Sequence, residues 1–130
     1  MKITALDHLV LTVADIGATA EWYSATLGCG VETFGAADGT TRTALTFGRQ
    51  KINLHRAGAE FRPHALHPGP GTADLCFLTD MPLDDWLAHL AARGETVEAG
   101  PVPRTGAQGP ITSLYLRDPD GNLIEVAVRD

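Results

Sequence analysis

The stretch Ser113–Val126, SLYLRDPDGNLIEV, decides the fold because it contains a strand, a tight turn and a second strand. In the turn, Pro119 fixes its backbone φ near about −65° and Gly121 accepts a positive φ. The flanking residues alternate with a period of two, which predicts paired β-strands. Their apolar face carries Leu114, Leu116, Ile124, Val126 and Val128. Glu125 lies on the opposite face of an apolar strand, where an unpaired buried carboxylate would cost several kcal/mol, so we expect it to have a function.

The composition predicts one globular domain of 130 residues, with 44% hydrophobic and 20% charged residues. A net charge of −6 argues against nucleic acid and anionic membranes as partners, because both favour basic surfaces. No apolar run approaches the ~20 residues of a membrane span. Cys29 and Cys76 have no metal-binding spacing, and we interpret them as buried free thiols in the cytoplasm.

The first half of the chain predicts a strand at Leu6–Ala14 and a helix at Gly17–Leu27. Asp15 is a typical N-cap, and Gly28 is a typical residue at the left-handed end of a helix. Three short strands are expected at 30–37, 41–48 and 50–56, followed by a connector at 57–71 that is rich in Gly, Pro and His.

The second half repeats this order. A strand is expected from Thr72, a helix at Leu83–Arg93, an irregular strand near 95–104 and a loop at 105–110, before the two strands around the Pro119 turn. His8 and Asp74 are 66 positions apart, as are Gly28 and Gly94, which indicates a duplicated module. The sequence therefore predicts an α+β fold of two tandem βαβββ modules.

One face of the predicted strands is aliphatic, whereas the other is polar. The polar face carries His8, Thr12, Asn53, His55, Asp74, Cys76, Ser113, Tyr115 and Glu125. This could be the solvated side of an antiparallel sheet. Long charged side chains are scarce there, however, and the mixture of His, Asp and Glu suits a lined cavity and a divalent metal. His64 and His67 lie in the connector, and we expect them at the surface.

The segments LDHLVLTVADIGATAEWYSATLG at Leu6–Gly28 and YLRDPDGNLIEV at Tyr115–Val126 resemble the vicinal oxygen chelate superfamily. This group includes glyoxalase I, fosfomycin-resistance thiol transferases, methylmalonyl-CoA epimerase, extradiol dioxygenases and bleomycin-binding proteins. The segments at 53–58, 73–77 and 100–111 are most similar to its glyoxalase-domain-containing branch. The resemblance implies one domain, with module one at about 1–57, a connector at 58–71 and module two at 72–130.

The resemblance also implies that the two sheets curl around a cleft that binds a divalent metal. It places His8 and Glu125 at two ligand positions. Asp74 occupies a third position, where the family usually has histidine, and either Asn53 or His55 occupies the fourth. Whether Asp74 ligates the metal or orients His8 stays open. Zn, Ni, Mn, Co or Fe are the candidate metals, although Asp74 weakens the two-His, one-carboxylate arrangement of iron oxygenases.

We therefore expect a glyoxalase-like lyase or isomerase whose small substrate chelates the metal through vicinal oxygens. Glu125 would act as general base, Arg104 would hold an anionic group and Tyr115 would donate to a substrate oxygen. A metal-free drug-binding resistance protein, or a thiol transferase, epimerase or dioxygenase on the same scaffold, are the alternatives. A thiol cofactor is left open. The expected assembly is a homodimer.

Overall fold

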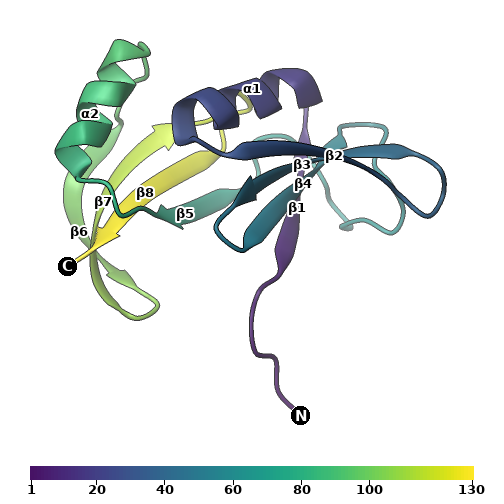
Figure 1. The fold of residues 1–130 in the computed structure, drawn as a ribbon, viewed down its shortest axis with the longest axis horizontal. Coiled ribbons are helices and arrows are strands. Elements are labelled where there is room, and N and C mark those ends of the chain that lie inside the picture. Colours follow the sequence, from purple (N-terminus) through teal and green to yellow (C-terminus); the bar gives the residue numbers. More distant parts are fainter. The chain divides into compact units, whose positions relative to one another are not determined.

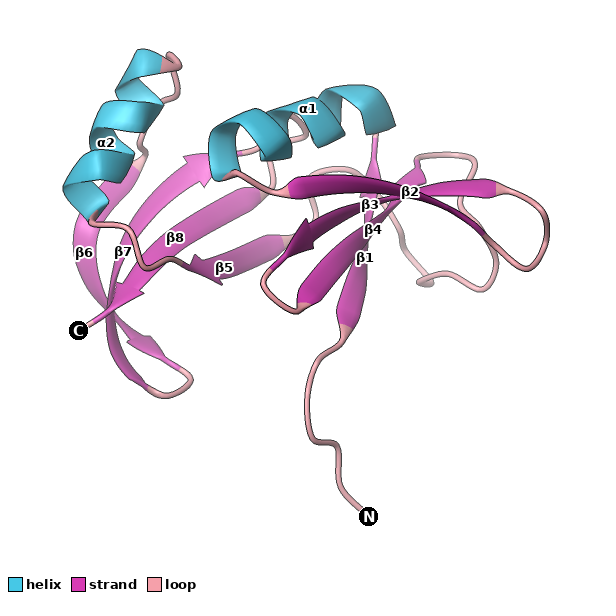
Figure 2. Ribbon diagram, viewed as in Figure 1, coloured by secondary structure: helices cyan, strands magenta, loops and turns pink.

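The computed structural model describes residues 1–130 and confirms the α+β fold of two tandem βαβββ modules (Figure 1). The chain divides into two compact units, Met1–Thr72 and Ala73–Asp130. Each unit has one four-stranded sheet and one helix, which Figure 2 distinguishes by colour. Neither helix is long and apolar enough to cross a membrane.

The first unit contains β1 (His8–Val13), α1 (Ile16–Leu27), β2 (Gly30–Gly35), β3 (Thr41–Phe47) and β4 (Gln50–Arg56). Its strand order is β1-β4-β3-β2, with β1 parallel to β4 and the other pairs antiparallel. Helix α1 packs on one face of the sheet, against β3 with further contacts to β2 and β4. The core on that face includes Leu11, Val13, Tyr23, Leu45, Ile52 and Leu54, all buried.

The ends of α1 follow the local signals in the sequence. The Asp15 carboxylate accepts a hydrogen bond from the Ala18 amide at 2.8 Å, which satisfies one of the free N–H groups of the first turn. Gly28 ends the helix with φ 74°, and its amide donates to the Ser24 carbonyl. A residue with a β-carbon is disfavoured in this left-handed conformation, so Gly28 fixes where the chain leaves the helix.

The second unit contains β5 (Asp74–Leu78), α2 (Leu83–Ala92), β6 (Ala99–Gly106), β7 (Gly109–Arg117) and β8 (Leu123–Arg129). Its strand order, β5-β8-β7-β6, repeats the topology of the first unit, with β5 parallel to β8. The apolar face is buried as expected: Leu114, Leu116 and Ile124 have no solvent exposure.

The turn between β7 and β8 is held by a buried polar network. One oxygen of the Asp118 carboxylate accepts from the amides of Asp120 and Asn122, each at 2.9 Å, and the other accepts from the Asn122 side chain at 2.7 Å. The side-chain Oδ1 of Asn122 in turn accepts from the Ala73 amide at 2.9 Å, just before β5 begins. The turn therefore also fixes the start of β5 beside β8.

The prediction of a loop at 105–110 is wrong. β6 runs to Gly106 and β7 begins at Gly109, so only two residues connect the strands, and Thr105 pairs with Pro110. The Gly and Pro residues there are typical of a loop, but they pair across the two-residue turn. β7 in turn pairs with β8 from Ile111 and Arg129 onward, which makes the hairpin part of the sheet. The segment 95–98 is not a strand, since β6 begins at Ala99 and is irregular between Ala99 and Val102.

Candidate functional site

The open face of the second sheet carries a row of chemically active side chains. In the strand register, Cys76 on β5 faces Glu125 on β8, and Glu125 faces Tyr115 on β7. Asp74 lies one alternation step from Cys76 on the same face. The predicted residues Asp74, Glu125 and Tyr115 are thus brought together by adjacent strands of one sheet.

Glu125 is oriented by two neighbours. The Ser113 hydroxyl, which belongs to a residue with 0% exposure, donates to Glu125 Oε1 at 2.5 Å. The Cys76 thiol also hydrogen-bonds to this carboxylate, and partial desolvation of the sulfur, together with the Glu125 charge, raises the pKa of Cys76 to about 11. Glu125 is partly exposed, so its carboxylate is accessible to a ligand or a proton.

Cys76 differs from the expectation that both cysteines are buried. Cys29 is buried, but Cys76 is exposed on the open face of β5. The residue type favours burial, whereas the alternation of the strand places Cys76 on the same face as Asp74. The general tendency of cysteine to be buried therefore led to a wrong prediction for Cys76, although strand alternation had placed it on the correct face.

Arg104 and Tyr115 form a second pair on the same face. The Arg104 Nε donates to the Tyr115 hydroxyl oxygen at 2.9 Å, and the guanidinium carbon lies 5.3 Å from the centre of the tyrosine ring. Because the tyrosine oxygen accepts this bond, its own O–H proton is free to donate to a ligand. Arg104 belongs to strand β6, which contains the end of the irregular strand that the sequence predicted near 95–104.

A cavity of about 360 Å³ in the second unit opens over these residues. Its lining includes Cys76, Arg104, Ile111, Tyr115, Glu125 and Arg129. A neighbouring hollow of about 350 Å³ shares Arg104, Tyr115 and Glu125 and adds Asp74. A volume of this size holds a small organic molecule. The three residues predicted to be catalytic therefore line one cavity.

The open face of the first sheet carries the other predicted ligands. In the parallel register of β1 and β4, Asn53 lies one alternation step beyond His8, and His55 lies two steps beyond it. The α-carbons of His8 and Asn53 are then about 8 Å apart, and those of His8 and His55 about 14 Å apart. Ligand atoms on one ion lie within about 2.0–2.2 Å of it, so the register favours Asn53 as the partner of His8.

Asn53 also has an unsatisfied oxygen. Its side-chain Oδ1 is buried and accepts no hydrogen bond, although buried polar atoms normally have a partner. His8 is more accessible: its side chain is 42% exposed, and its Nδ1 lies 2.7 Å from an Asp7 carboxylate oxygen. This contact leaves Nε2 of His8 available, and a carboxylate behind a histidine is the usual support of a metal-bound imidazole.

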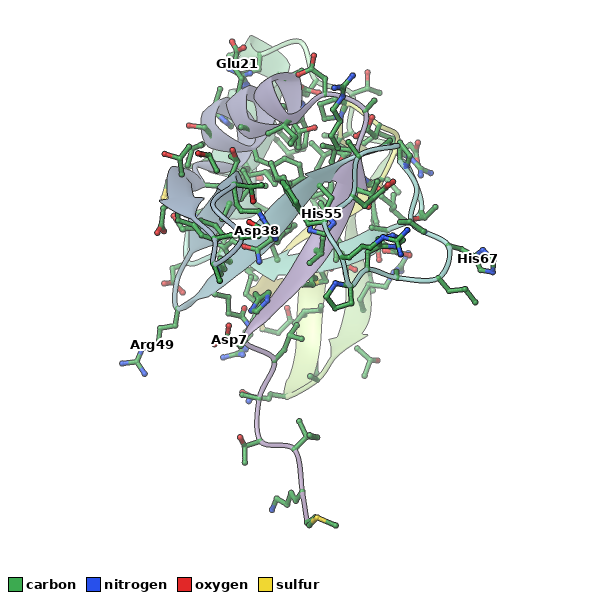
Figure 3. All side chains as sticks on the ribbon, turned by 90° about the vertical axis from the view of Figure 1, so that its right-hand side faces the viewer. Asp7, Glu21, Asp38, Arg49, His55 and His67 are labelled. Carbon is green, nitrogen blue, oxygen red and sulfur yellow. The ribbon has the colours of Figure 1, made fainter.

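His55 occupies a covered position on β4. It is only 6% exposed, and its Nδ1 is buried without a hydrogen-bond partner. The Phe61 ring packs edge-to-face on the imidazole at 5.3 Å, with the Arg42 guanidinium 3.6 Å from the centre of Phe61. Burial, and next the Arg42 charge, lower the pKa of His55, which keeps the imidazole neutral. Figure 3 shows His55 against the sheet and His67 projecting from the connector. As expected, His64 and His67 are both exposed.

The candidate ligand side chains form one pair in each sheet, and their atom types suit a divalent metal. Asp74 and Glu125, like His8 and Asn53, are one alternation step apart on adjacent parallel strands. Imidazole nitrogen, amide oxygen and carboxylate oxygen are ligands of first-row divalent metals. No group of three or more His, Cys, Asp or Glu side chains is arranged to hold a metal ion. Ligation by this predicted set stays a prediction.

Sequence reasoning missed three contributions to the site. Ser113 was placed on the polar face, but nothing local indicated its bond to Glu125. Arg129 lies four residues from Glu125 on the same strand and therefore on the same face, so strand alternation could have indicated it. Phe61 lies in the connector, where no periodicity shows which strand it covers.

Comparison with protein families matches residues 5–126 to the Glyoxalase/Bleomycin resistance protein/Dioxygenase superfamily. Virulence protein STM3117 of Salmonella typhimurium is 50% identical over 127 residues, which cover 98% of this chain and 85% of that protein. Glyoxalase domain-containing protein RDO1 of Mycosarcoma maydis is also 50% identical, covering 98% of this chain and 69% of the relative.

Among solved structures, an integron cassette protein from the mobile metagenome of V. cholerae has 57% identity and a TM-score of 0.93, covering 100% of this chain and 98% of the other. A lactoylglutathione lyase from Agrobacterium tumefaciens has 26% identity and a TM-score of 0.69, covering 98% and 95%. TnmS3, an antibiotic binding protein from Streptomyces, is 22% identical with a TM-score of 0.75, covering 100% and 99%, and shares the fold.

Proposed function

The chain belongs to the Glyoxalase/Bleomycin resistance protein/Dioxygenase superfamily, and we propose that it is a glyoxalase-like, metal-dependent lyase or isomerase. Its substrate would be a small molecule that chelates a divalent ion through vicinal oxygens. The observation that carries this proposal is Glu125, a carboxylate that a buried serine holds through one oxygen and that lines a cavity. The similarity to a lactoylglutathione lyase supports the reaction class.

We propose His8, Asn53, Asp74 and Glu125 as the ligands of one divalent ion, with Zn, Mn, Ni, Co or Fe as candidates. Asn53 replaces His55 in this set because the strand register brings Asn53 nearer to His8 and because its buried Oδ1 lacks a donor. A bound ion would supply Lewis-acid stabilisation of negative charge on the substrate oxygens.

The protein's own residues account for the proton transfer. Released from the metal, the Glu125 carboxylate would take a proton from the carbon next to a carbonyl, while the bond from Ser113 to Oε1 keeps it oriented. The Tyr115 hydroxyl accepts from Arg104 and can therefore donate its proton to a substrate oxygen. Arg104 keeps the N–H groups of Nη2 for an anionic part of the substrate.

We further propose that the protein acts as a homodimer in the cytoplasm, where Cys29 and Cys76 stay reduced. A monomer mass by light scattering at micromolar concentration would contradict the dimer. Whether a thiol cofactor takes part can be read from the dependence of turnover on added thiol.

A second candidate function is sequestration of a small molecule without a metal. It is favoured by the absence of any group of three acidic, histidine or cysteine side chains arranged around one point. The cavity of about 360 Å³ in the second unit is large enough for a small ligand in either case. Metal content separates the two functions.

The test is the metal stoichiometry of protein purified without a histidine tag, measured by mass spectrometry. About one equivalent per chain is expected in the wild type and less than a tenth in His8→Ala and Glu125→Ala. His67→Ala is the matched control, because His67 is exposed in the connector and should keep full occupancy. Unchanged metal content in both ligand variants would contradict the proposal, and no uptake by the wild type would favour sequestration.

A further inference from the structure

Two arginines occupy one cross-strand row at the end of the cavity in the second unit. Arg104 on β6 faces Ile111 on β7, and Ile111 faces Arg129 on β8. All three side chains line the cavity of about 360 Å³, so they point to the same face of the sheet. With about 4.8 Å between strands, the α-carbons of the arginines are roughly 10 Å apart. Two long side chains can therefore reach a single group that lies above Ile111.

These two positive charges are not neutralised by the protein. Arg129 makes no ion pair or side-chain hydrogen bond, and Arg104 donates only to the neutral oxygens of Tyr115 and Pro103. By contrast, Arg42 and Arg117 are paired with Asp38 and Glu98. Among the residues that line the cavity, Glu125 is the only carboxylate, and it already accepts from Ser113.

The surrounding charge makes this row unusual. The chain carries a net charge of −6, so its long-range field disfavours anions. Two unpaired guanidinium groups at one end of a cavity counteract that field locally, and each offers the planar donor pair that suits carboxylate and phosphate oxygens. Thr105 and Gln108 add further hydrogen-bonding side chains beside the β6–β7 turn.

We propose that Arg129, together with Arg104, forms an anion subsite and that the substrate is a small organic anion carrying a carboxylate or phosphate-type group. Arg129 lies four residues along β8 from Glu125, about 13–14 Å between α-carbons. The anionic group is therefore separated from the reacting oxygens by a linker of several bonds. The assignment of those oxygens to the Glu125 end rests on the proposed function, whereas the anion subsite itself does not need the metal.

The test is a titration of the isotope-labelled protein followed by two-dimensional NMR of its amides. The probes are inorganic phosphate and propionate, with propionamide as the uncharged analogue of propionate. At least one anion should shift the amides of residues 104–111 and 129, and propionamide should not. Arg129→Gln should weaken that binding roughly tenfold or more, and Arg129→Lys should restore most of it because the charge returns.

Arg49→Gln is the matched control, since Arg49 is an exposed, unpaired arginine in the turn between β3 and β4 (Figure 3). It should bind the anion as the wild type does. Equal binding in the wild type and Arg129→Gln would overturn the subsite, as would no binding of either anion or equal binding of propionamide. Folded, wild-type-like spectra of both Arg129→Gln and Arg129→Lys show that a loss of binding in Arg129→Gln reflects charge and not unfolding.

The titration is repeated on Glu125→Ala to separate the two hypotheses. Loss of metal with retained anion binding in this variant supports both of them. A wild type that binds the anion but no metal refutes the proposed reaction and leaves the subsite standing. A wild type that binds metal, with no anion binding, refutes the subsite alone.

Discussion

Replacement of Ser113 by alanine tests the most specific contact of the site. The Ser113 hydroxyl is fully buried and donates to Glu125 Oε1 at 2.5 Å, which orients this carboxylate. Removing it leaves Oε1 without a donor from β7 and lets the Glu125 side chain rotate. Supporting residues of this kind typically contribute 10–100-fold to metal affinity, about 1.4–2.8 kcal/mol.

The lower end of that range applies here. Cys76 still hydrogen-bonds to the carboxylate, and Glu125 is partly exposed, so water can replace the lost donor. We expect Ser113→Ala to bind Zn²⁺ or Mn²⁺ about tenfold more weakly than the wild type, with a loss of unfolding free energy of no more than about 1 kcal/mol. Competition against a fluorescent chelator measures the affinity, and denaturant unfolding measures the stability.

Thr112→Val is the matched control for this experiment. Thr112 is the preceding residue of β7 and points to the opposite face, where its hydroxyl donates to an Asp130 carboxylate oxygen at 2.7 Å. The variant thus deletes a similar hydroxyl–carboxylate bond away from the cavity, and its metal affinity should equal that of the wild type. Equal affinities in wild type and Ser113→Ala, or the same loss in Thr112→Val, would refute the reasoning.

Three further predictions concern stability. Asn122→Ala removes the side chain that joins Asp118 to the Ala73 amide and should lower the free energy of unfolding, measured in urea, by about 2–3 kcal/mol. A loss below about 1 kcal/mol would contradict the stabilising role of this network. Gly28→Ala places a β-carbon at φ 74° and should lower the free energy of unfolding by about 1 kcal/mol. Gly35→Ala, at a residue without a positive φ, should lower it less, and equal melting temperatures of the two variants would contradict the role of Gly28 at the helix end. The Arg117 guanidinium lowers the pKa of Glu98, so this carboxylate stabilises the fold above its unfolded pKa and ceases to do so as the pH falls through its folded pKa. Unfolding midpoints of Glu98→Gln and wild type should therefore differ at pH 7 and converge once the pH has fallen below the folded pKa of Glu98, and a constant difference would contradict the pairing.

The sequence predicted those parts of the fold that local chemistry determines. The Asp15 cap, the Gly28 helix end and the Asp118–Asn122 turn each depend on residues within one turn of the chain, and all were confirmed. Strand alternation likewise placed Leu114 and Ile124 on the buried face. Both kinds of signal are present in short windows of sequence.

Features that depend on distant partners were not predictable in the same way. The segment around Gly106 has the composition of a loop, but Gly106 pairs with Gly109 in a β6–β7 hairpin, and β7 pairs in turn with the distant end of β8 from Ile111 onward. The cover of Phe61 over His55 and the bond from Ser113 to Glu125 likewise depend on residues on other elements. Alternation placed Asn53 and His55 on the same face and left the choice between them open, and the register of β1 against β4 was needed to favour Asn53.

The most direct test of the central claim is anomalous X-ray diffraction at the absorption edge of zinc or manganese, on crystals of the metal-loaded protein. The account predicts one strong peak per chain within bonding distance, about 2.0–2.2 Å, of a Glu125 carboxylate oxygen and a His8 nitrogen. Asp74 and Asn53 should complete the shell, with His55 outside it. A peak ligated by other residues, or no peak after loading, would contradict the account.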